Sequence, residues 1–378
     1  MTTPEPVSTP QSAPTVAASI DWRHVLIDLL VPLLAIFTAL VIGAVIIFIT
    51  GANVFAAYSG LFRGALGSPG AIANTLVEST PYLFAGLAVA LGFKCGLFNI
   101  GAEGQLAMGS LFAAVAGASI HGLPMIIHLP LAIVCGWLGG ALWGGIAGLL
   151  RAKTGAHEVI TTIMLNYIAI RLTDYLIKGP LKDPSASAPR TSNIAPSAEL
   201  PFLFGADYRL HAGFLLALVA AFLVWWLLNK TTTGFEIRTV GANPDAAQYA
   251  GMSITRNFIL AMSLSGGLAG LAGTATVLGL EHNLKAAFTA GYGFDSIAVA
   301  LLARSNPIGV IPAAIFWGAL RNGAGLMQLE SGISINLINI IQALVIVFVA
   351  ADQIVRWLYR IRARGSSGHA VFTRGWGG

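Results

Sequence analysis

Residues 231–256, TTTGFEIRTVGANPDAAQYAGMSITR, are the most polar long segment between the apolar runs of this 378-residue chain. The stretch from Asn243 to Gly251 predicts a short helix. Asn243 is a good N-cap, Pro244 suits a first position that needs no N–H, and Asp245 complements the positive end of the helix dipole. Gly251 can end the helix. Two turns of helix are not stable alone in water, so the segment has to rest on other structure, either its own membrane domain or a cytosolic partner.

The composition places the chain in a membrane. It is 56% hydrophobic and 10% charged, with a mean hydropathy of +0.77, whereas soluble domains carry about 25% charged residues. We therefore expect an all-α polytopic membrane protein. The two cysteines, Cys95 and Cys135, form no CxxC pair, and the sequence predicts neither a metal site nor a disulfide framework.

About 20 apolar residues cross a bilayer, and the hydropathy pattern predicts ten spans, some of them short or broken. They lie near residues 27–49, 81–98, 104–119, 130–150, 159–177, 211–229, 257–280, 291–304, 307–325 and 335–351. The predicted membrane domain covers 21–352, between a disordered tail at 1–20 and a basic, Gly-rich tail at 353–378.

The orientation follows from the basic residues between the spans. With the N-terminus inside, thirteen Lys and Arg residues fall on the inner side and six on the outer side, while Arg171 and Arg321 lie within spans. This asymmetry predicts that both termini are cytosolic. The loop at 230–256 is then cytosolic, and the Pro-rich loop at 179–210 is outside, either as an ordered cap or as a flexible loop.

Glycines predict how the helices pack. In the fourth span a glycine recurs at every fourth residue from Gly136 to Gly148, and Gly266 and Gly270 repeat this spacing in the seventh. Small residues let helix backbones approach closely where lipid supplies no hydrophobic drive.

Two polar constellations interrupt the apolar spans. In the fifth span, Glu158, Thr162, Asn166 and Thr173 share one helix face, which predicts either hydrogen bonds between helices or a wall of a solute pathway.

The second constellation is GLFNIGAEGQLAMGS, residues 96–110, with Asn99, Glu103 and Gln105. Broken helices at membrane depth usually line a cavity. Glu103 fits a pathway and equally fits an acid that stabilises a helix start. Asp295 belongs to a run of only fourteen residues, 291–304, which suggests a partial span near such a cavity. The candidate pathway residues are Asn99, Glu103, Gln105, Thr162, Asn166 and Asp295.

Some catalytic motifs are absent from the sequence. No lysine follows a glycine, so there is no P-loop of the GxxxxGK[ST] kind, and no HExxH motif or nucleophile elbow occurs. We therefore expect no enzyme activity in this chain and no ATP site of that type.

Three motifs together resemble a known family: GLFNIGAEGQLAMGS, GAHEVITTIMLNYIA and EIRTVGANPDAAQYAGMSI. They are similar to the bacterial ABC importer permeases for branched-chain amino acids, simple sugars and nucleosides, and most of all to nucleoside-type permeases that work with basic-membrane-protein lipoproteins. The likeness extends over about residues 75–350, with Ala303 standing where the family usually has glycine.

The resemblance implies the type II ABC importer permease fold, in the bacterial inner membrane, and a cytosolic coupling helix that docks on an ATPase. Ala247, being small, would let this helix enter a groove of the ATPase. The residues expected to dock are Gly241, Asn243, Pro244, Asp245, Ala246, Ala247, Tyr249 and Gly251.

The implied partners are an ABC ATPase that carries ATP and Mg²⁺, a second permease subunit that is related but different, an extracytoplasmic solute-binding lipoprotein and membrane lipid, with no nucleic acid. The expected solute is a nucleoside. A simple sugar, a riboflavin-like molecule or a purine base are alternatives, and an ion-coupled carrier acting alone is the alternative from another class.

Overall fold

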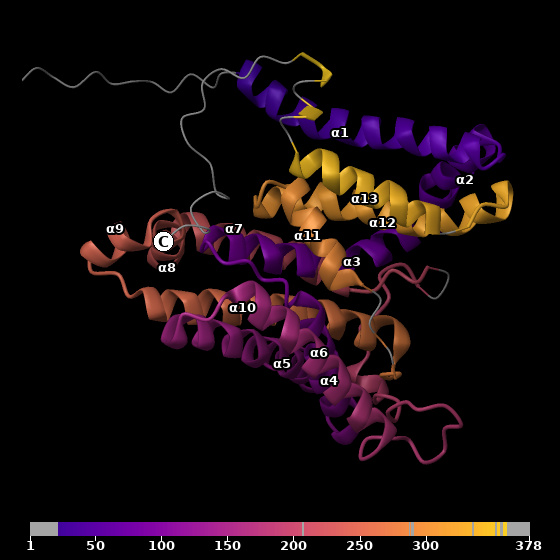
Figure 1. Cartoon of the computed structure of the whole chain (residues 1–378). Coiled ribbons are helices and arrows are strands. Elements are labelled where there is room, and N and C mark those ends of the chain that lie inside the picture. Colours follow the sequence, from indigo (N-terminus) through magenta and orange to yellow (C-terminus); the bar gives the residue numbers. More distant parts are fainter. Residues whose placement is uncertain are drawn as a thin grey trace, which may run out of the picture.

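The computed structural model describes residues 22–360 except 206–207, 287, 289–290, 335, 352–353 and 356–357. The tail predicted at 1–20 and most of that predicted at 353–378 lie outside the described residues. Thirteen α-helices form the described part (Figure 1). They are α1 (Trp22–Ile49), α2 (Val54–Leu66), α3 (Pro69–Lys94), α4 (Ala102–Ser119), α5 (Met125–Thr154), α6 (Glu158–Lys178), α7 (Gly213–Lys230), α8 (Thr232–Ala242), α9 (Pro244–Tyr249), α10 (Ile254–Thr276), α11 (Tyr292–Leu302), α12 (Pro307–Ser331) and α13 (Asn336–Ala350).

Each of the ten predicted spans overlaps one of these helices, and the all-helical class is confirmed for the described residues. Five of the described helices are long and apolar enough to cross a membrane: α1, α3, α5, α7 and α10 with its π-helical end. Sequence reasoning missed α2 and began α3 twelve residues too late, at 81 instead of Pro69. Ser68 caps α3 by accepting a hydrogen bond from Ala71 N at 3.0 Å, and Pro69 occupies the first turn.

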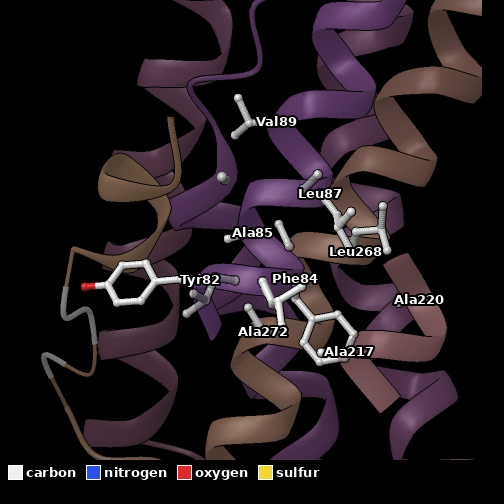
Figure 2. Packing of buried hydrophobic residues seen from close by; sticks show 14 of the residues in the cluster. Tyr82, Phe84, Ala85, Leu87, Val89, Ala217, Ala220, Leu268 and Ala272 are labelled. Atoms are coloured by element: carbon white, nitrogen blue, oxygen red, sulfur yellow. The ribbon is translucent and has the colours of Figure 1, made fainter. Parts of the chain in front are cut away.

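Helix α3 is the centre of the domain. Every residue from Ser79 to Phe93 is buried. Figure 2 shows the Phe84 side chain beside Ala217 of α7 and Ala272 of α10, whereas Tyr82 points to the opposite side of α3. One side of α3 therefore belongs to the apolar core, and the other carries a polar group inside the membrane.

Glycines form the contact between α5 and α10. A Cβ atom added to Gly140 of α5 would lie 2.2 Å from Gly266 O of α10, and one added to Gly270 would lie 2.7 Å from Gly136 O. Both distances are shorter than a real Cβ contact. Helices α5 and α10 thus meet backbone to backbone. The glycine spacing predicted close packing of each helix, and the structure shows that the two pack against each other.

The polar segments lie at opposite ends of the bundle (Figure 1). Helices α8 and α9 form one end. At the other end the described residues of the loop at 179–210 form an ordered cap over the end of α10, which finishes in a π-helix, η2 (Val277–Glu281). The cap is attached by backbone hydrogen bonds from Ile194 N to His282 O and from Leu200 N to Leu278 O, both 2.8 Å.

Candidate functional site

The predicted short helix is α9, and its boundaries follow from its capping residues. The Asn243 side chain accepts a hydrogen bond from Ala246 N at 3.1 Å, with Pro244 in the first turn. Asp245 also lies in the first turn. Gly251 has a φ of +82° and donates its N–H to Gln248 O at 2.9 Å, which ends the helix.

The prediction that Ala247 enters a groove of a partner is wrong for this structure, because Ala247 faces inward. It is 0% exposed and packs against the chain's own domain, so it is not free to enter a partner's groove. The exposed residues of α9 are Pro244, Asp245, Ala246, Gln248 and Tyr249, and Tyr249 is 95% exposed. The physical reason is that a six-residue helix stays folded only by burying one side chain, and Ala247 is that side chain.

Gly241 connects this segment to the membrane domain. A Cβ atom added to it would lie 2.3 Å from Lys94 O at the end of α3. In addition, Asn257 at the start of α10 donates a hydrogen bond to Glu236 of α8 at 3.0 Å. Helix α8 therefore packs directly on the ends of α3 and α10.

The predicted pathway residues Asn99 and Gln105 form a buried amide network. Two hydrogen bonds join their side chains, at 2.8 and 3.0 Å, and Asn99 also donates to Ser265 Oγ of α10 at 2.7 Å. Ser265 Oγ donates in turn to Ala88 O of α3 at 2.6 Å. Both amide side chains are 1% exposed, so the network links α3, α4 and α10 rather than facing a cavity.

Asn166 and Thr162 lie on the buried face of α6, against the start of α4. Asn166 Oδ1 accepts from Gly104 N, and its Nδ2 donates to Ile100 O, both at 2.8 Å. Thr162 donates to Glu158 O within its own helix at 2.7 Å. Of the two readings left open by the sequence, these contacts support hydrogen bonding between helices.

Glu103 stabilises a helix start, but that of a distant helix. Its carboxylate accepts hydrogen bonds from Gly291 N at 3.0 Å and from Gly293 N at 2.6 Å, at the start of α11. The close approach requires glycine, because a Cβ atom on Gly293 would lie 2.2 Å from Glu103 N. The starts of the short helices α4 and α11 thus meet at one carboxylate, which complements the dipole of α11.

Asp295 lies apart from the amide network, in a group of side chains that sequence reasoning missed. Tyr82 Oη donates a hydrogen bond to Asp295 Oδ2 at 3.1 Å, and Arg321 Nη1 donates to Tyr82 Oη at 3.1 Å. Tyr292 Oη donates to Glu78 Oε2 at 3.1 Å, and Arg321 Nε lies 3.4 Å from the same oxygen. We call Glu78, Tyr82, Tyr292, Asp295 and Arg321 the Arg321 cluster.

The rings complete the geometry of this cluster. The Arg321 guanidinium carbon is 4.5 Å from the centre of the Tyr292 ring, and the Tyr82 and Tyr292 rings meet edge to face with centroids 5.0 Å apart. One sequence signal could have located it, namely an arginine within an apolar span. Such a charge costs on the order of 2.5–3.5 kcal/mol near the bilayer centre unless it is paired or hydrated.

Comparison with known proteins gives the family. Residues 71–350 match the model described as the permease component of the branched-chain amino acid transport system. The guanosine ABC transporter permease protein NupP of Bacillus subtilis is 45% identical over 346 residues, covering 90% of this chain and 98% of that protein.

Two further relatives are each 36% identical. The glucose ABC transporter permease protein TsgB13 of Haloferax volcanii aligns over 85% of this chain and 87% of its own. The nucleoside ABC transporter permease protein NupB of Lactococcus lactis aligns over 86% and 92%. No solved structure matches. The family model matches most of the chain, and the long apolar helices are those of a membrane protein. This multi-pass membrane protein therefore belongs to the branched-chain amino acid transport system permease family.

Proposed function

We propose that this chain is the transmembrane permease subunit of an ATP-driven ABC importer that carries a nucleoside into the cytosol. The observation that carries the proposal is the 45% identity, over 90% of the chain, to a guanosine permease. A second relative named for nucleosides supports it. In this proposal ATP and Mg²⁺ are bound by a separate ATPase, and this chain itself catalyses no reaction.

The proposed assembly follows from the two polar ends. Helix α9 faces the cytosol and docks on the ATPase through its exposed residues Asp245, Gln248 and Tyr249. The cap at 179–210 faces outward, toward a solute-binding lipoprotein. A second permease subunit, related but different, completes the pathway. Ten spans, two cytosolic termini and a bacterial inner-membrane location belong to the same proposal.

The test is uptake of labelled guanosine by cells that express this chain with its partner subunits. We expect uptake that requires this chain and that stops when the Walker A lysine of the ATPase is replaced. Persistent uptake with the inactive ATPase would indicate an ion-coupled carrier instead.

Glucose is the second candidate solute, because a 36% identical relative is named as a glucose permease. Competition decides between the two solutes. If excess unlabelled glucose blocks guanosine uptake as well as unlabelled guanosine does, glucose also binds and the assignment to nucleosides alone is wrong.

Docking is tested at the exposed ring of Tyr249. Tyr249→Ala should reduce both co-purification of the ATPase and uptake without lowering the yield of folded protein, because the side chain is 95% exposed in this chain. Tyr175→Ala is the matched control, since Tyr175 is 68% exposed near the opposite end of the bundle. Equal effects of both substitutions would contradict docking through α9.

A further inference from the structure

The Arg321 cluster contains charged groups that are partly open to the surface at membrane depth. Tyr82, hydrogen-bonded to Arg321, lies near the middle of α3, one of the long apolar helices. Nevertheless, the Arg321 side chain is 35% exposed and the Glu78 side chain 31%. Lipid cannot solvate these groups, so the face that carries them borders water or another subunit.

The same face carries aromatic surface beside the charges. Tyr292 stands between Glu78, which its hydroxyl contacts, and Arg321, whose guanidinium covers its ring. Asp295 follows one turn later on α11, and the neighbouring Phe294 is 48% exposed. A guanidinium fork, two carboxylates and a ring thus come together on a single face, from α3, α11 and α12.

We propose that the Arg321 cluster lines the solute pathway and recognises a heteroaromatic base that has a carbonyl group next to an N–H group. Arg321 would donate its paired N–H groups to acceptors such as O6 and N7 of guanine, and Asp295 or Glu78 would accept from ring or exocyclic N–H groups. The Tyr292 ring would stack on the base. This inference rests on the proposed import of nucleosides and assigns the residues that select among them.

The cavity beside the cluster is small in this structure. The pocket beside it, lined by Glu78, Pro81, His211, Thr276 and Tyr292 among others, has a free volume of about 10 Å³, enough for roughly one water molecule. A base does not fit in this cavity, and a base that stacks on Tyr292 has to displace the Arg321 guanidinium from that ring. In this exchange each charged group finds a new partner. Arg321 donates to a base carbonyl instead of pairing with Glu78, and Glu78 accepts from a base N–H instead of pairing with Arg321.

The experiment compares uptake of guanosine with uptake of adenosine, whose base lacks the carbonyl, in cells that carry the complete transporter. In Arg321→Gln we expect the guanosine-to-adenosine ratio to fall about tenfold, the discrimination of a bidentate arginine contact. Arg321→Lys keeps the charge but loses the fork, so the ratio should fall by a smaller factor. Tyr292→Leu removes stacking and should lower uptake of both nucleosides severalfold, whereas Tyr292→Phe retains it.

Arg63→Gln is the matched control. Arg63 of α2 forms an ion pair with Glu330 at the end of α12, with an N–O distance of 2.5 Å, and its side chain is 61% exposed. Removing this arginine also breaks a contact of α12, but away from the cluster, so the guanosine-to-adenosine ratio should stay unchanged. Yield and co-purification with the ATPase are measured for every variant.

The outcomes separate this inference from the proposed function. If the unaltered transporter takes up no nucleoside, the proposed function fails. If it imports guanosine but the folded Arg321 variants keep its ratio, or folded Tyr292→Leu keeps its uptake of both nucleosides, or all four variants lose both nucleosides equally, the recognition role fails. Should Arg321→Gln not fold, Arg321→Lys and the two Tyr292 variants decide by the same criteria.

Discussion

At the scale of single residues, the polar side chains inside this membrane domain form two groups, which differ in burial and in their partners. Asn99, Gln105 and Asn166 are fully buried and hydrogen-bonded to neighbouring helices. Arg321 and Glu78 pair with each other but remain partly exposed. Buried, satisfied amides hold helices together, whereas charges at an open face at membrane depth need water or a ligand.

Asn166→Leu should therefore destabilise the domain. The substitution leaves the buried Gly104 N–H and Ile100 carbonyl without their partners, which costs about 1–3 kcal/mol for each unsatisfied group. Thermal unfolding of the purified protein in detergent should show a clear decrease. Thr173→Val is the control on the same buried face, because the Thr173 hydroxyl has no hydrogen-bond partner and its loss should be nearly neutral. Equal melting temperatures for wild type and Asn166→Leu would contradict this role.

His211, which lies between the loop at 179–210 and α7, predicts a pH dependence. Its side chain is 1% exposed, and its Nδ1 accepts a hydrogen bond from Gly213 N at 3.1 Å. Burial, helped by the nearby His282, lowers the pKa of His211 to about 4. The unfolded chain, with a pKa near 6.5, therefore takes up the proton first.

Stability from neutral His211 is thus complete above about pH 6.5 and is lost as the pH falls toward 4. Between pH 7 and pH 5 the loss of stability should be on the order of 2 kcal/mol. We expect a lower melting temperature at pH 5 than at pH 7, and a smaller difference in His211→Gln. His121→Gln, at an exposed position between α4 and α5, should retain the wild-type difference. If the melting temperature of His211→Gln falls between pH 7 and pH 5 as much as that of the wild type, another group is responsible.

At the scale of elements, contact between backbones sets the arrangement of α5 and α10. Glycines of both helices face each other, and a Cβ atom added to Gly140, Gly144, Gly266 or Gly270 would meet the partner's backbone, which cannot move aside as a flexible side chain can. The same applies where Gly293 meets the start of α4 and where Gly241 meets the end of α3. These three contacts determine how close the elements lie.

Gly140→Ala should separate α5 from α10. Its Cβ atom would lie 2.2 Å from Gly266 O and 2.7 Å from Gly270 Cα, and overpacking of this kind costs about 1–3 kcal/mol. We expect a lower melting temperature and a lower yield of monodisperse protein. Gly325→Ala in α12 is the control: nothing lies within 4 Å of its added Cβ, so better helix propensity should leave stability unchanged or raise it by up to about 1 kcal/mol. If both substitutions act alike, close packing is not what determines this helix pair.

At the scale of the whole molecule, the two ends of the bundle present different surfaces. One end presents α9 with its exposed polar and aromatic surface, and the other presents the ordered cap (Figure 1). Between them α3 reaches from its contact with Gly241 to the Arg321 cluster. The element that would receive force from an ATPase and the one that carries the candidate recognition residues are therefore the same helix.

The predicted orientation is tested by cysteine labelling in right-side-out vesicles, in a Cys135→Ser background that leaves only the buried Cys95. Ser187→Cys in the cap should react with an impermeant maleimide, and Gln248→Cys in α9 should react only after permeabilisation. Both positions are exposed, so access depends on the side of the membrane. The reverse pattern would overturn the inside assignment of both termini.

The sequence by itself determined the class, the approximate position of ten helices, the caps of α9 and the glycine faces of α5 and α10. All of these depend on hydropathy or on spacing within one helix, which a single segment records. Only the tertiary structure decided that Ala247 faces inward, that Glu103 caps a helix 188 residues away and that Arg321 meets Tyr82, 239 residues away. Such partners are fixed by how the helices pack, because a local pattern shows that a polar group needs a partner without showing which one it finds.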